Sequence, residues 1–316
     1  MSKKILLSGV KPTGAPHIGN YFGAMKQMVD LQNSGNYDCY FMIADYHALN
    51  LIQNAETLRD YNINLALDYM AIGLDPKNST IFKQSDVSAH TELAWIFDSI
   101  TTMPYLMRAH AFKDAEAKDK EISVGTFNYP MLMAADILLY DVDTVPVGQD
   151  QKQHIEYTRD TAQKFNNIFG ETFKLPEPFI MKEVSVVSGT DGQKMSKSYK
   201  NTIPLFASRE EIIKSVMSIV TDSGGDIPAN VYNIHKLLRS EDELKSIYDQ
   251  NKGKYKILKE SLIEDLDLFI KPLREKREEL SKNVDEIKAI LADGASRAKV
   301  RADAKLLTVK KNIGVN

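Results

Sequence analysis

The chain has 316 residues, a length that suits two domains better than one small domain. Its formal net charge of −3 argues against a protein that coats nucleic acid indiscriminately, so any basic surface for RNA must be local. Because there is no apolar run of membrane-spanning length, no second cysteine beside Cys39 and no zinc-spaced Cys/His cluster, we expect a cytoplasmic protein without signal peptide, disulfide or protein-held metal.

Strand-like and helix-like segments alternate through the first two-thirds of the chain. Short apolar or β-branched segments predict buried parallel strands at Lys4–Gly9, Cys39–Ala44, Thr80–Lys83, Val142–Val147 and Met181–Val187. Apolar residues at helical spacing predict helices at Ile18–Leu31 and about Glu56–Ile72. This alternation predicts an α/β fold with a Rossmann-like, doubly wound parallel sheet and helices on both faces.

After about Asn201 the pattern is helical only. Two capping boxes predict helix starts, Ser208 with Glu211 and Ser240 with Glu243. Further helices are predicted at Lys254–Lys271, Val284–Ala292 and Ala295–Lys311, with a break or kink at Pro272 and a helix end at Gly294. We therefore divide the chain into a Rossmann-like domain, residues 1–203, and an all-helical C-terminal domain, residues 204–316.

A glycine-rich loop, Ser8–Asn20, joins the first predicted strand to the first predicted helix. It has neither the G-x-G-x-x-G spacing nor the G-K-[ST] of a P-loop. His17 and Asn20 stand at the helix start, where side-chain donors and free backbone N–H groups suit the phosphates of ATP, and Gly19 would let a nucleotide approach closely. The alternative is a strand-to-helix turn with an incidental histidine.

A second polar loop has the sequence Lys194-Met195-Ser196-Lys197-Ser198. Two lysines and two serines at this spacing can surround a polyphosphate, closing as the phosphate bond breaks and opening to release pyrophosphate. The alternative is a solvated basic turn.

The pair of loops, in this order, resembles the paired signature of the class I aminoacyl-tRNA synthetases. Pro16-His17-Ile18-Gly19-Asn20 is similar to the HIGH motif, with Asn20 in place of the second histidine, and Lys194–Ser198 matches KMSKS letter for letter. The resemblance implies an enzyme that uses ATP with Mg²⁺ to load an amino acid onto tRNA.

A carboxylate within an apolar segment bears on the choice of amino acid. Asp136 lies in Asn128–Leu139, and a buried carboxylate is costly unless it meets a donor. The indole N–H of tryptophan is such a donor, and Met133 offers a soft contact to an aromatic ring. The alternative is a capping or ion-paired aspartate. Further along, Gly148–Gln151 is predicted to open another helix. There Asp150 could accept from ribose hydroxyls, and Gln151 could bind the α-amino or carboxylate group of the amino-acid substrate. The alternative for this segment is a polar helix start with an aspartate near the N-terminus.

These segments also resemble the bacterial-type tryptophanyl-tRNA synthetases (tryptophan–tRNA ligases), nearly end to end. Leu132–Leu138 (L-M-A-A-D-I-L) and Val145–His154 (V-P-V-G-Q-D-Q-K-Q-H) carry the most specific likeness. The resemblance implies that tryptophan's carboxylate attacks the α-phosphate of ATP, giving tryptophanyl-adenylate and pyrophosphate, and that tryptophan then passes to tRNA(Trp). It also implies a homodimer with a helical dimerisation insertion at about residues 85–140, and an anticodon-binding role for the C-terminal helices.

The resemblance assigns site residues by position. Those implied for tryptophan are Leu7, His47, Tyr129, Met133, Asp136, Ile137, Val145 and Gln151. Those implied for ATP are Lys11, Pro12, Thr13, Gly19, Asn20, Gly148, Gln149, Asp150, Lys194, Met195, Ser196, Lys197 and Ser198. Those implied to act on the reacting phosphates are His17, Asn20, Lys194, Lys197 and Lys11.

Three positions depart from the family pattern. Lys11 stands where glutamine is common, and Ala115 stands where familiar members carry a lysine that helps with pyrophosphate. Our hypothesis is that Lys11 supplies that charge from the opposite wall; the alternative is that Lys118 or Lys120 supplies it. Leu7 replaces a common aromatic residue, which changes the expected pocket shape.

Two competing functions remain at this stage. A tyrosyl-tRNA synthetase would share the fold but needs partners for a phenol hydroxyl, and a non-catalytic paralogue would bind tryptophan or tRNA for regulation. On the RNA side, the last predicted helix carries the most basic stretch, a candidate tRNA contact whose alternative is a solvated surface helix. Its cations are Arg297, Lys299, Arg301, Lys305, Lys310 and Lys311.

Overall fold

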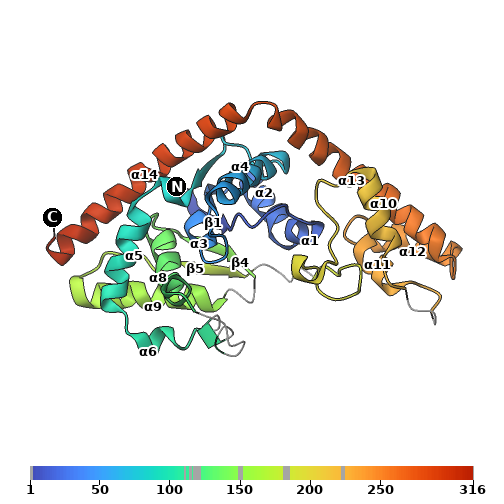
Figure 1. The fold of residues 1–316 in the computed structure, drawn as a ribbon. Coiled ribbons are helices and arrows are strands. Elements are labelled where there is room, and N and C mark those ends of the chain that lie inside the picture. Colours follow the sequence, from blue (N-terminus) through green and yellow to red (C-terminus); the bar gives the residue numbers. More distant parts are fainter. Residues whose placement is uncertain are drawn as a thin grey trace.

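The computed structural model describes residues 3–109, 112–113, 116, 122–148, 152–180, 186–221 and 225–315 (Figure 1). At its centre is a parallel sheet of five strands in the order β3-β2-β1-β4-β5. The strands are β1 (Lys4–Val10), β2 (Tyr37–Ile43), β3 (Ser79–Lys83), β4 (Thr144–Val147) and β5 (Glu177–Ile180). The central pairing of β1 with β2 runs in register from Lys4 opposite Tyr37 to Val10 opposite Ile43.

Alternate residues of the strands feed two separate cores, as a doubly wound sheet requires. Ile5 and Leu7 of β1 point into one core, whereas Leu6 between them points into the other. The first core is covered by α5 (Ala89–Ile100), α8 (Val124–Leu138) and α9 (Lys152–Phe169). The second is covered by α2 (Lys26–Asn33) and α4 (Ala55–Ala71). The predicted Rossmann-like fold is therefore confirmed.

Short helical segments complete the sheet domain. They are α1 (Ile18–Asn20), the π-helical η1 (Tyr21–Met25), α3 (Asp45–Ala48), η2 (Gln84–Asp86), α6 (Met103–Leu106) and η4 (Lys197–Tyr199). The helix expected at Ile18–Leu31 is thus α1, η1 and α2 in succession, and the helix expected to stop at Gly73 is α4, with Gly73 in the left-handed region at φ 106°.

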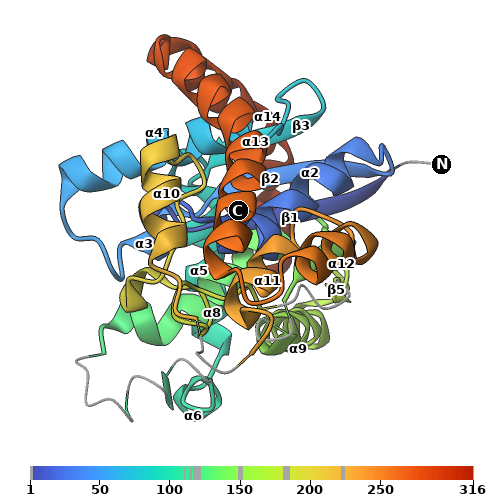
Figure 2. The ribbon, with the colours of Figure 1, turned by 90° about the vertical axis from the view of Figure 1, so that its right-hand side faces the viewer.

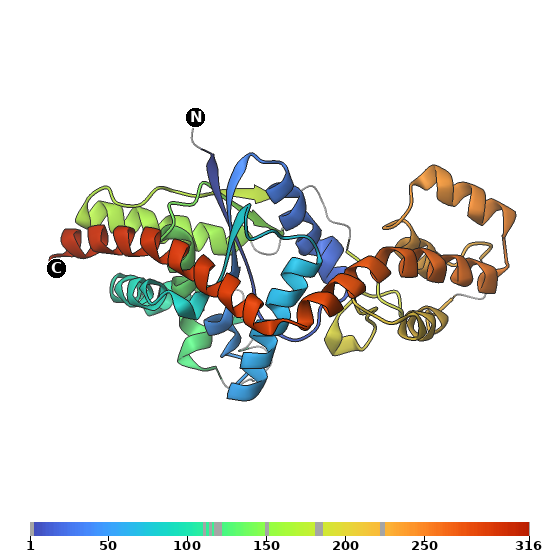
Figure 3. The same ribbon diagram turned by 90° about the horizontal axis from the view of Figure 1, so that it is seen from above.

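The C-terminal part of the described chain is helical, as predicted. It contains α10 (Arg209–Met217), α11 (Ala229–His235), α12 (Glu241–Gln250), α13 (Tyr255–Ser281) and α14 (Val284–Ile313). Both capping boxes are present, at Ser208 with Glu211 and at Ser240 with Glu243. Viewed from the side of these helices, α10, α11 and α12 lie in front of the sheet (Figure 2), and from above they stand apart from it, joined to the rest by α13 (Figure 3).

Helix α14 returns from the C-terminal helices to the sheet and passes along its β3 edge (Figure 3). Its first buried residues, Ile287 and Leu291, belong to one core, and its later ones, from Ala295 to Val309, belong to the other. Gly294 lies at the crossing. A Cβ there would stand 1.9 Å from the carbonyl oxygen of Ile81, so only glycine lets the helix lie against the edge strand.

Two expectations about element boundaries were wrong, and a third lies largely outside the described residues. Gly294 does not end a helix, because the contact with Ile81 requires it inside α14. Pro272 does not break α13, which runs through it; Pro272 is exposed, so water can satisfy the carbonyl that loses its donor. The fifth strand of the described part is Glu177–Ile180. Of the strand expected at Met181–Val187, residues 181–185 lie outside the described part, and Val186 and Val187 are not in a strand.

Two further features of the described chain concern membrane spans and the boundary between its domains. Within the described residues, no helix combines the length and the apolar character needed to cross a membrane. The domain boundary near residue 203 stays a prediction, and α14, which follows it, packs on the sheet as well as on its C-terminal neighbours.

Candidate active site

One pocket of about 580 Å³ opens where β1, β2 and β4 end, at the carboxyl edge of the sheet. It collects residues far apart in sequence, several of which the sequence had assigned to tryptophan or ATP. Those assigned from the sequence are Leu7, Lys11, His47, Tyr129, Met133, Asp136, Ile137, Val145 and Gly148. Lining residues that the sequence reading missed include Gly23, Ala24, Met42, Asn50, Thr126 and His154.

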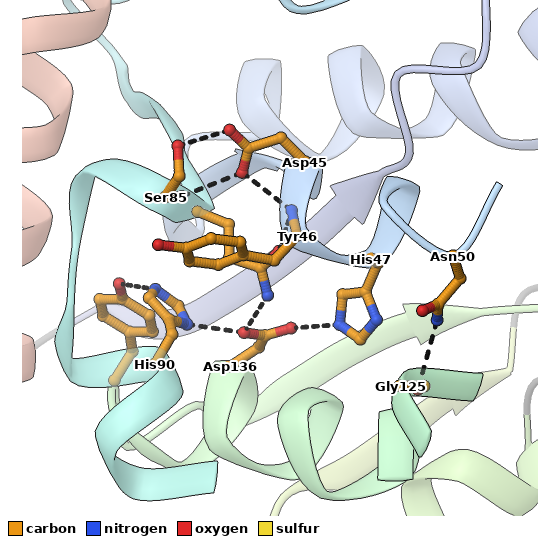
Figure 4. A network of polar contacts seen from close by, with 10 residues as sticks. Asp45, Tyr46, His47, Asn50, Ser85, His90, Gly125 and Asp136 are labelled. Atoms are coloured by element: carbon orange, nitrogen blue, oxygen red, sulfur yellow. Dashed lines mark hydrogen bonds and ion pairs between the residues drawn. The ribbon is translucent and has the colours of Figure 1, made fainter. Parts of the chain in front are cut away.

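Asp136 forms the polar floor of this pocket and is buried, with 2% of its surface exposed. Its Oδ2 lies 2.9 Å from Nε2 of His47, and its Oδ1 lies 2.6 Å from Nδ1 of His90. Gln84 donates to the same Oδ1 at 2.7 Å. Figure 4 shows the two histidines on opposite sides of the carboxylate.

These donors hold Asp136 in its charged form. Burial alone would raise the pKa of Asp136, but the hydrogen bonds from His47 and His90 outweigh burial and lower the pKa to about 2. An ionised carboxylate only accepts, so each histidine nitrogen that faces it carries a proton. A carboxylate offers about four acceptor positions. Among the described residues three of these are filled, which leaves one on Oδ2, and Asp136 lines the pocket.

A second row of contacts fixes the donors themselves. Gln84 accepts from the backbone N–H of Tyr46 at 3.1 Å, and the second ring nitrogen of His90 faces the hydroxyl of Tyr140 at 2.8 Å. Nearby, buried Asp45 accepts from both the backbone and the hydroxyl of Ser85 (Figure 4). The orientation of Asp136 is therefore set from α3, η2 and α5 together.

The sequence reading missed Gln84 and His90. The only signal was a histidine inside an apolar helical run, between Ala89 and Leu93, which predicts a buried side chain that needs a polar partner.

Tyr129 and Lys11 form the outer wall of the pocket. The Tyr129 hydroxyl lies 3.1 Å from Nε2 of His154, and burial raises the pKa of Tyr129 to about 12. The Lys11 ammonium lies 5.8 Å from the centre of the Tyr129 ring, and the surrounding protein lowers the pKa of Lys11 by desolvation. The structure thus places Lys11 at the pocket mouth, facing an aromatic ring rather than an acid.

His17 and Asn20 cap the first helix reciprocally. Asn20 donates its backbone N–H to Nδ1 of His17 at 3.2 Å, while its side-chain oxygen accepts from the backbone N–H of His17 at 3.1 Å. Nδ1 is therefore the acceptor and the proton sits on Nε2, which has no partner among the described residues. Burial, aided by the nearby charge of Lys197, lowers the pKa of His17 to about 4.

The lysine-containing loop is anchored at its centre and exposed around it. Met195 is buried in the core on the α2 and α4 side of the sheet. Buried Asn201 accepts from the backbone N–H of Ser196 at 2.7 Å and donates to the carbonyl of Lys194 at 3.1 Å. Asn201 is a loop-supporting residue that the sequence reading missed. Lys194, Lys197 and Ser198 remain exposed.

The two loops touch each other directly. Lys197 donates to the carbonyls of Thr13 and Gly14, at 3.0 and 2.9 Å. The backbone of Ile18 donates to Ile203, just beyond the lysine-containing loop, at 3.0 Å. A Cβ on Gly19 would lie 2.8 Å from Nδ1 of His17 and 3.2 Å from Cβ of Met195. Glycine is required there first by the His17 ring of the same loop and then by Met195 of the other loop, whatever a nucleotide requires.

Several assigned residues lie elsewhere or outside the described part. In the glycine-rich loop, Pro12 is buried and Thr13 is exposed. The assigned residues that do not line the pocket are Pro12, Thr13, His17, Gly19, Asn20 and Lys194–Ser198. Outside the described residues lie Gln149, Asp150, Gln151, Ala115, Lys118 and Lys120. Among the residues that are described, no group of three or more His, Cys, Asp or Glu side chains is arranged to hold a metal ion.

Comparisons with known proteins agree on one family. A family model described as class I tRNA synthetases (W and Y) matches residues 2–266. A tryptophan–tRNA ligase of Fusobacterium nucleatum is 48% identical over 98% of this chain and 97% of its own length. The crystal structure of Campylobacter jejuni tryptophanyl-tRNA synthetase complexed with ADP and tryptophan has a TM-score of 0.91 at 43% identity, covering 98% of this chain and 99% of that one. That of Mycoplasma pneumoniae tryptophanyl-tRNA synthetase has a TM-score of 0.85 at 29% identity, covering 100% and 99%.

Proposed function

The chain belongs to the class I tRNA synthetases of the tryptophan and tyrosine group, and we propose that it is a tryptophan–tRNA ligase of bacterial type. It activates L-tryptophan with ATP, giving tryptophanyl-adenylate and pyrophosphate, and transfers tryptophan to tRNA(Trp). One observation carries the choice of amino acid: an ionised carboxylate, Asp136, keeps one acceptor position free beside a pocket lined by Leu7, Met133 and Ile137. The indole of tryptophan matches this arrangement, because it is flat, apolar and carries a single N–H donor.

In the first step the carboxylate oxygen of tryptophan forms a bond to the α-phosphorus. The bond from that phosphorus to the bridging oxygen breaks, and pyrophosphate leaves with the electron pair. We assign the charge stabilisation to donors of the two loops. Neutral His17 offers its Nε2–H, and the lysine-containing loop offers Lys194 and Lys197. No covalent nucleophile is needed, because orientation and electrostatics supply the rate.

Several further assignments rest on the family. ATP enters with Mg²⁺, and Thr13, Gly148 and the Gln149–Gln151 segment contact the nucleotide and the amino acid. The enzyme acts in the cytoplasm as a homodimer that pairs through the helical insertion at about residues 85–140. Exposed apolar side chains in that segment support the pairing: Trp95, Met103 and Val124 are 73%, 66% and 74% exposed. The C-terminal helices beyond residue 203 read the anticodon.

Amino-acid-dependent ATP–pyrophosphate exchange tests this function. We expect purified protein to exchange label in the presence of tryptophan and not of tyrosine. Exchange with tyrosine alone would contradict the tryptophan assignment, and no exchange with either amino acid would identify a non-catalytic paralogue. Charging of tRNA(Trp) transcripts with labelled tryptophan then tests the second step.

We also propose that Lys11 supplies a positive charge for pyrophosphate from the pocket mouth. Lys11 lies over the Tyr129 ring and has no acidic partner among the described residues, which leaves its ammonium available for phosphate. We expect Lys11→Gln to lower the rate of pyrophosphate exchange by roughly tenfold, because one preorganised charge is lost at the leaving group. Lys4→Gln, at the opposite end of β1, is the control. An unchanged exchange rate in Lys11→Gln would refute this role.

A further inference from the structure

A buried ion pair joins the sheet domain to the C-terminal helices. Asp68 of α4 is only 2% exposed, and its Oδ1 accepts from Nε of Arg277 on α13 at 2.5 Å. The same guanidinium donates to the side chain of Asn64, one turn earlier on α4, at 2.8 Å. The Arg277 side chain is 25% exposed whereas that of Asp68 is 2% exposed, so loss of Arg277 would leave a buried, unpaired charge on Asp68. The placement of this pair between two parts of the chain therefore calls for a role beyond stability.

Helix α13 also contacts the segment that follows the lysine-containing loop. The guanidinium of Arg277 lies 5.2 Å from the centre of the Phe206 ring, and Arg274 donates to the carbonyl of Ala207. Both Phe206 and Ala207 follow Ile203, which is bonded to the first loop at Ile18. One turn of α13 thus touches both α4 and the segment that leads out of the loop.

Helix α4 lies beside the lysine that this loop presents. Tyr61 and Asp68 are seven residues apart, two turns of helix, and so share one face of α4. A Cβ on Gly14 would lie 3.4 Å from Cζ of Tyr61 and 3.7 Å from Nζ of Lys197, which places the ammonium near this face. Burial lowers the pKa of the Lys197 ammonium, and the negative charge of Asp68 partly opposes this lowering. Lys197 has no ion pair in the described part of the chain.

Arg277 keeps the Asp68 carboxylate ionised. Burial raises the pKa of Asp68 to about 6, even though Arg277 and Lys197 both oppose the rise. Without Arg277, one of the two cations that oppose burial would be lost, so the pKa of Asp68 would rise further and its charge would be less favoured. The negative charge that Lys197 experiences therefore depends on a residue of the C-terminal helices.

We propose that Asp68 and Arg277 are positioning residues for Lys197, holding its ammonium against the glycine-rich loop where the triphosphate is bound. The proposal rests on the proposed function, because it assumes that Lys197 acts on phosphate. It adds that the placement of this lysine is set through α4 by a guanidinium of α13.

Lysine reactivity in the ligand-free protein tests the positioning without any assay of activity. Acetic anhydride acetylates neutral, accessible amines, and mass spectrometry compares Lys197 with Lys194, which has no partner among the described residues and serves as the internal standard. In Asp68→Asn and Arg277→Gln we expect the ratio of Lys197 to Lys194 labelling to rise by about threefold or more, because Lys197 loses an attracting charge. Lys276→Gln, which removes an exposed charge from the adjacent position on α13, should leave the ratio unchanged.

Steady-state exchange kinetics test the consequence for the reaction. We expect Asp68→Asn and Arg277→Gln each to lower kcat on the order of tenfold with the KM for tryptophan unchanged, as a misplaced catalytic group does. The double variant should be no worse than the poorer single variant, and Arg277→Lys should recover much of the loss. If Arg277→Gln does not fold, Asp68→Asn, which keeps the shape of the side chain, serves for both measurements.

An unchanged labelling ratio in Asp68→Asn, or kcat values within twofold of wild type alongside a lowered Tm, would show that the pair is only structural. Failure of the proposed function is distinguishable, since wild-type protein would then show no tryptophan-dependent exchange while the labelling result would stand by itself.

Discussion

At Asp136 a charge survives burial because the protein surrounds it with donors before any ligand arrives. His47, His90 and Gln84 come from three different elements and converge on two oxygens. Such a network stabilises the protein more when all its hydrogen bonds are made, because a low dielectric strengthens each bond that is made and raises the cost of each one that is missing. In the proposed function the network would also select the ligand, because an ionised acceptor disfavours a substrate that brings a second acceptor to the same place.

Replacing this carboxylate should impair recognition of tryptophan. Asp136→Asn turns one acceptor into a donor facing His47 or His90, and leaves the indole N–H without a charged partner. We expect kcat/KM for tryptophan in the exchange reaction to fall by about 10²–10³, with the KM for ATP little changed. Asp160→Asn, at an exposed carboxylate that bonds Tyr105, is the matched control. Equal losses in the two variants would remove the assigned role.

His17 should titrate far below an ordinary histidine. Its pKa is lowered to about 4 by burial and by Lys197. Between pH 6.5 and 4 His17 is protonated in the unfolded chain but neutral in the native state. The contribution of His17 to the free energy of unfolding is therefore fully present above pH 6.5 and is lost as the pH falls through 4. NMR should show one histidine with a midpoint near 4, absent in His17→Gln. Urea unfolding at pH 5 and 7 should show a smaller pH effect in that variant. A midpoint near 6.5 would contradict the structure.

At the scale of elements, α14 shows how a tertiary contact can reverse a local rule. Glycine lowers helix stability in isolation, yet Gly294 sits in the middle of a helix from Val284 to Ile313. Its hydrogen replaces a Cβ that would overlap the Ile81 carbonyl. Arg297, one turn later, donates to the carbonyls of Pro76 and Ser79 at the start of β3. The helix therefore protects the sheet edge by direct contact with its backbone.

The smallest possible side chain at this crossing should already be too large. We expect Gly294→Ala to lower the free energy of unfolding by about 1–3 kcal/mol, because helix and strand must separate, although alanine is otherwise the better helix former. Gly23→Ala is the matched control, since a Cβ there meets nothing within 4 Å. Urea unfolding of both variants measures the difference. A Gly294→Ala protein as stable as wild type would show that the edge contact is loose.

The sequence predicted what repeats locally and missed what depends on a distant contact. Alternation of strands and helices, the capping boxes and the two loops are local patterns, and the structure has them. The edge strand at Glu177–Ile180 was not predicted because Pro178 lowers strand propensity, while an edge position tolerates proline. In the pocket, motif residues such as Asp136 were found, whereas Gln84 and His90 were missed because neither belongs to a motif.

At the scale of the whole molecule, the most basic stretch of the chain serves largely to attach α14 to the sheet domain. Lys305 pairs with Asp141 at 2.6 Å and donates to the carbonyl of Thr172, and Lys310 pairs with Glu92. Lys299 pairs with Asp303 along the helix. In the described part of the chain, these cations already have partners, which favours a structural role for the stretch over a free surface for tRNA.

The proposed dimer can be followed with the protein's own tryptophan. Trp95 is the sole tryptophan of the sequence and is 73% exposed in the single chain. Burial at a subunit interface should shift its emission to shorter wavelength, and dilution should reverse the shift. We expect Trp95→Glu to sediment as a monomer, because a charge would be buried between subunits without a partner. Leu268→Glu, at an equally exposed site on α13, should sediment like wild type. A Trp95→Glu protein that remains dimeric would place the interface elsewhere.

The covering of the β3 edge by α14 has a consequence for biosynthesis. The ribosome makes all five strands before it makes this helix, since α14 follows every strand along the chain. Until then the β3 edge of the nascent sheet is open. One of its two cores is also incomplete, because the α14 residues Ala298 and Leu306 belong to that core. An open edge invites pairing with other chains, so the growing polypeptide passes through a period of vulnerability to aggregation. Helix α14 ends that period by covering the β3 edge of the sheet.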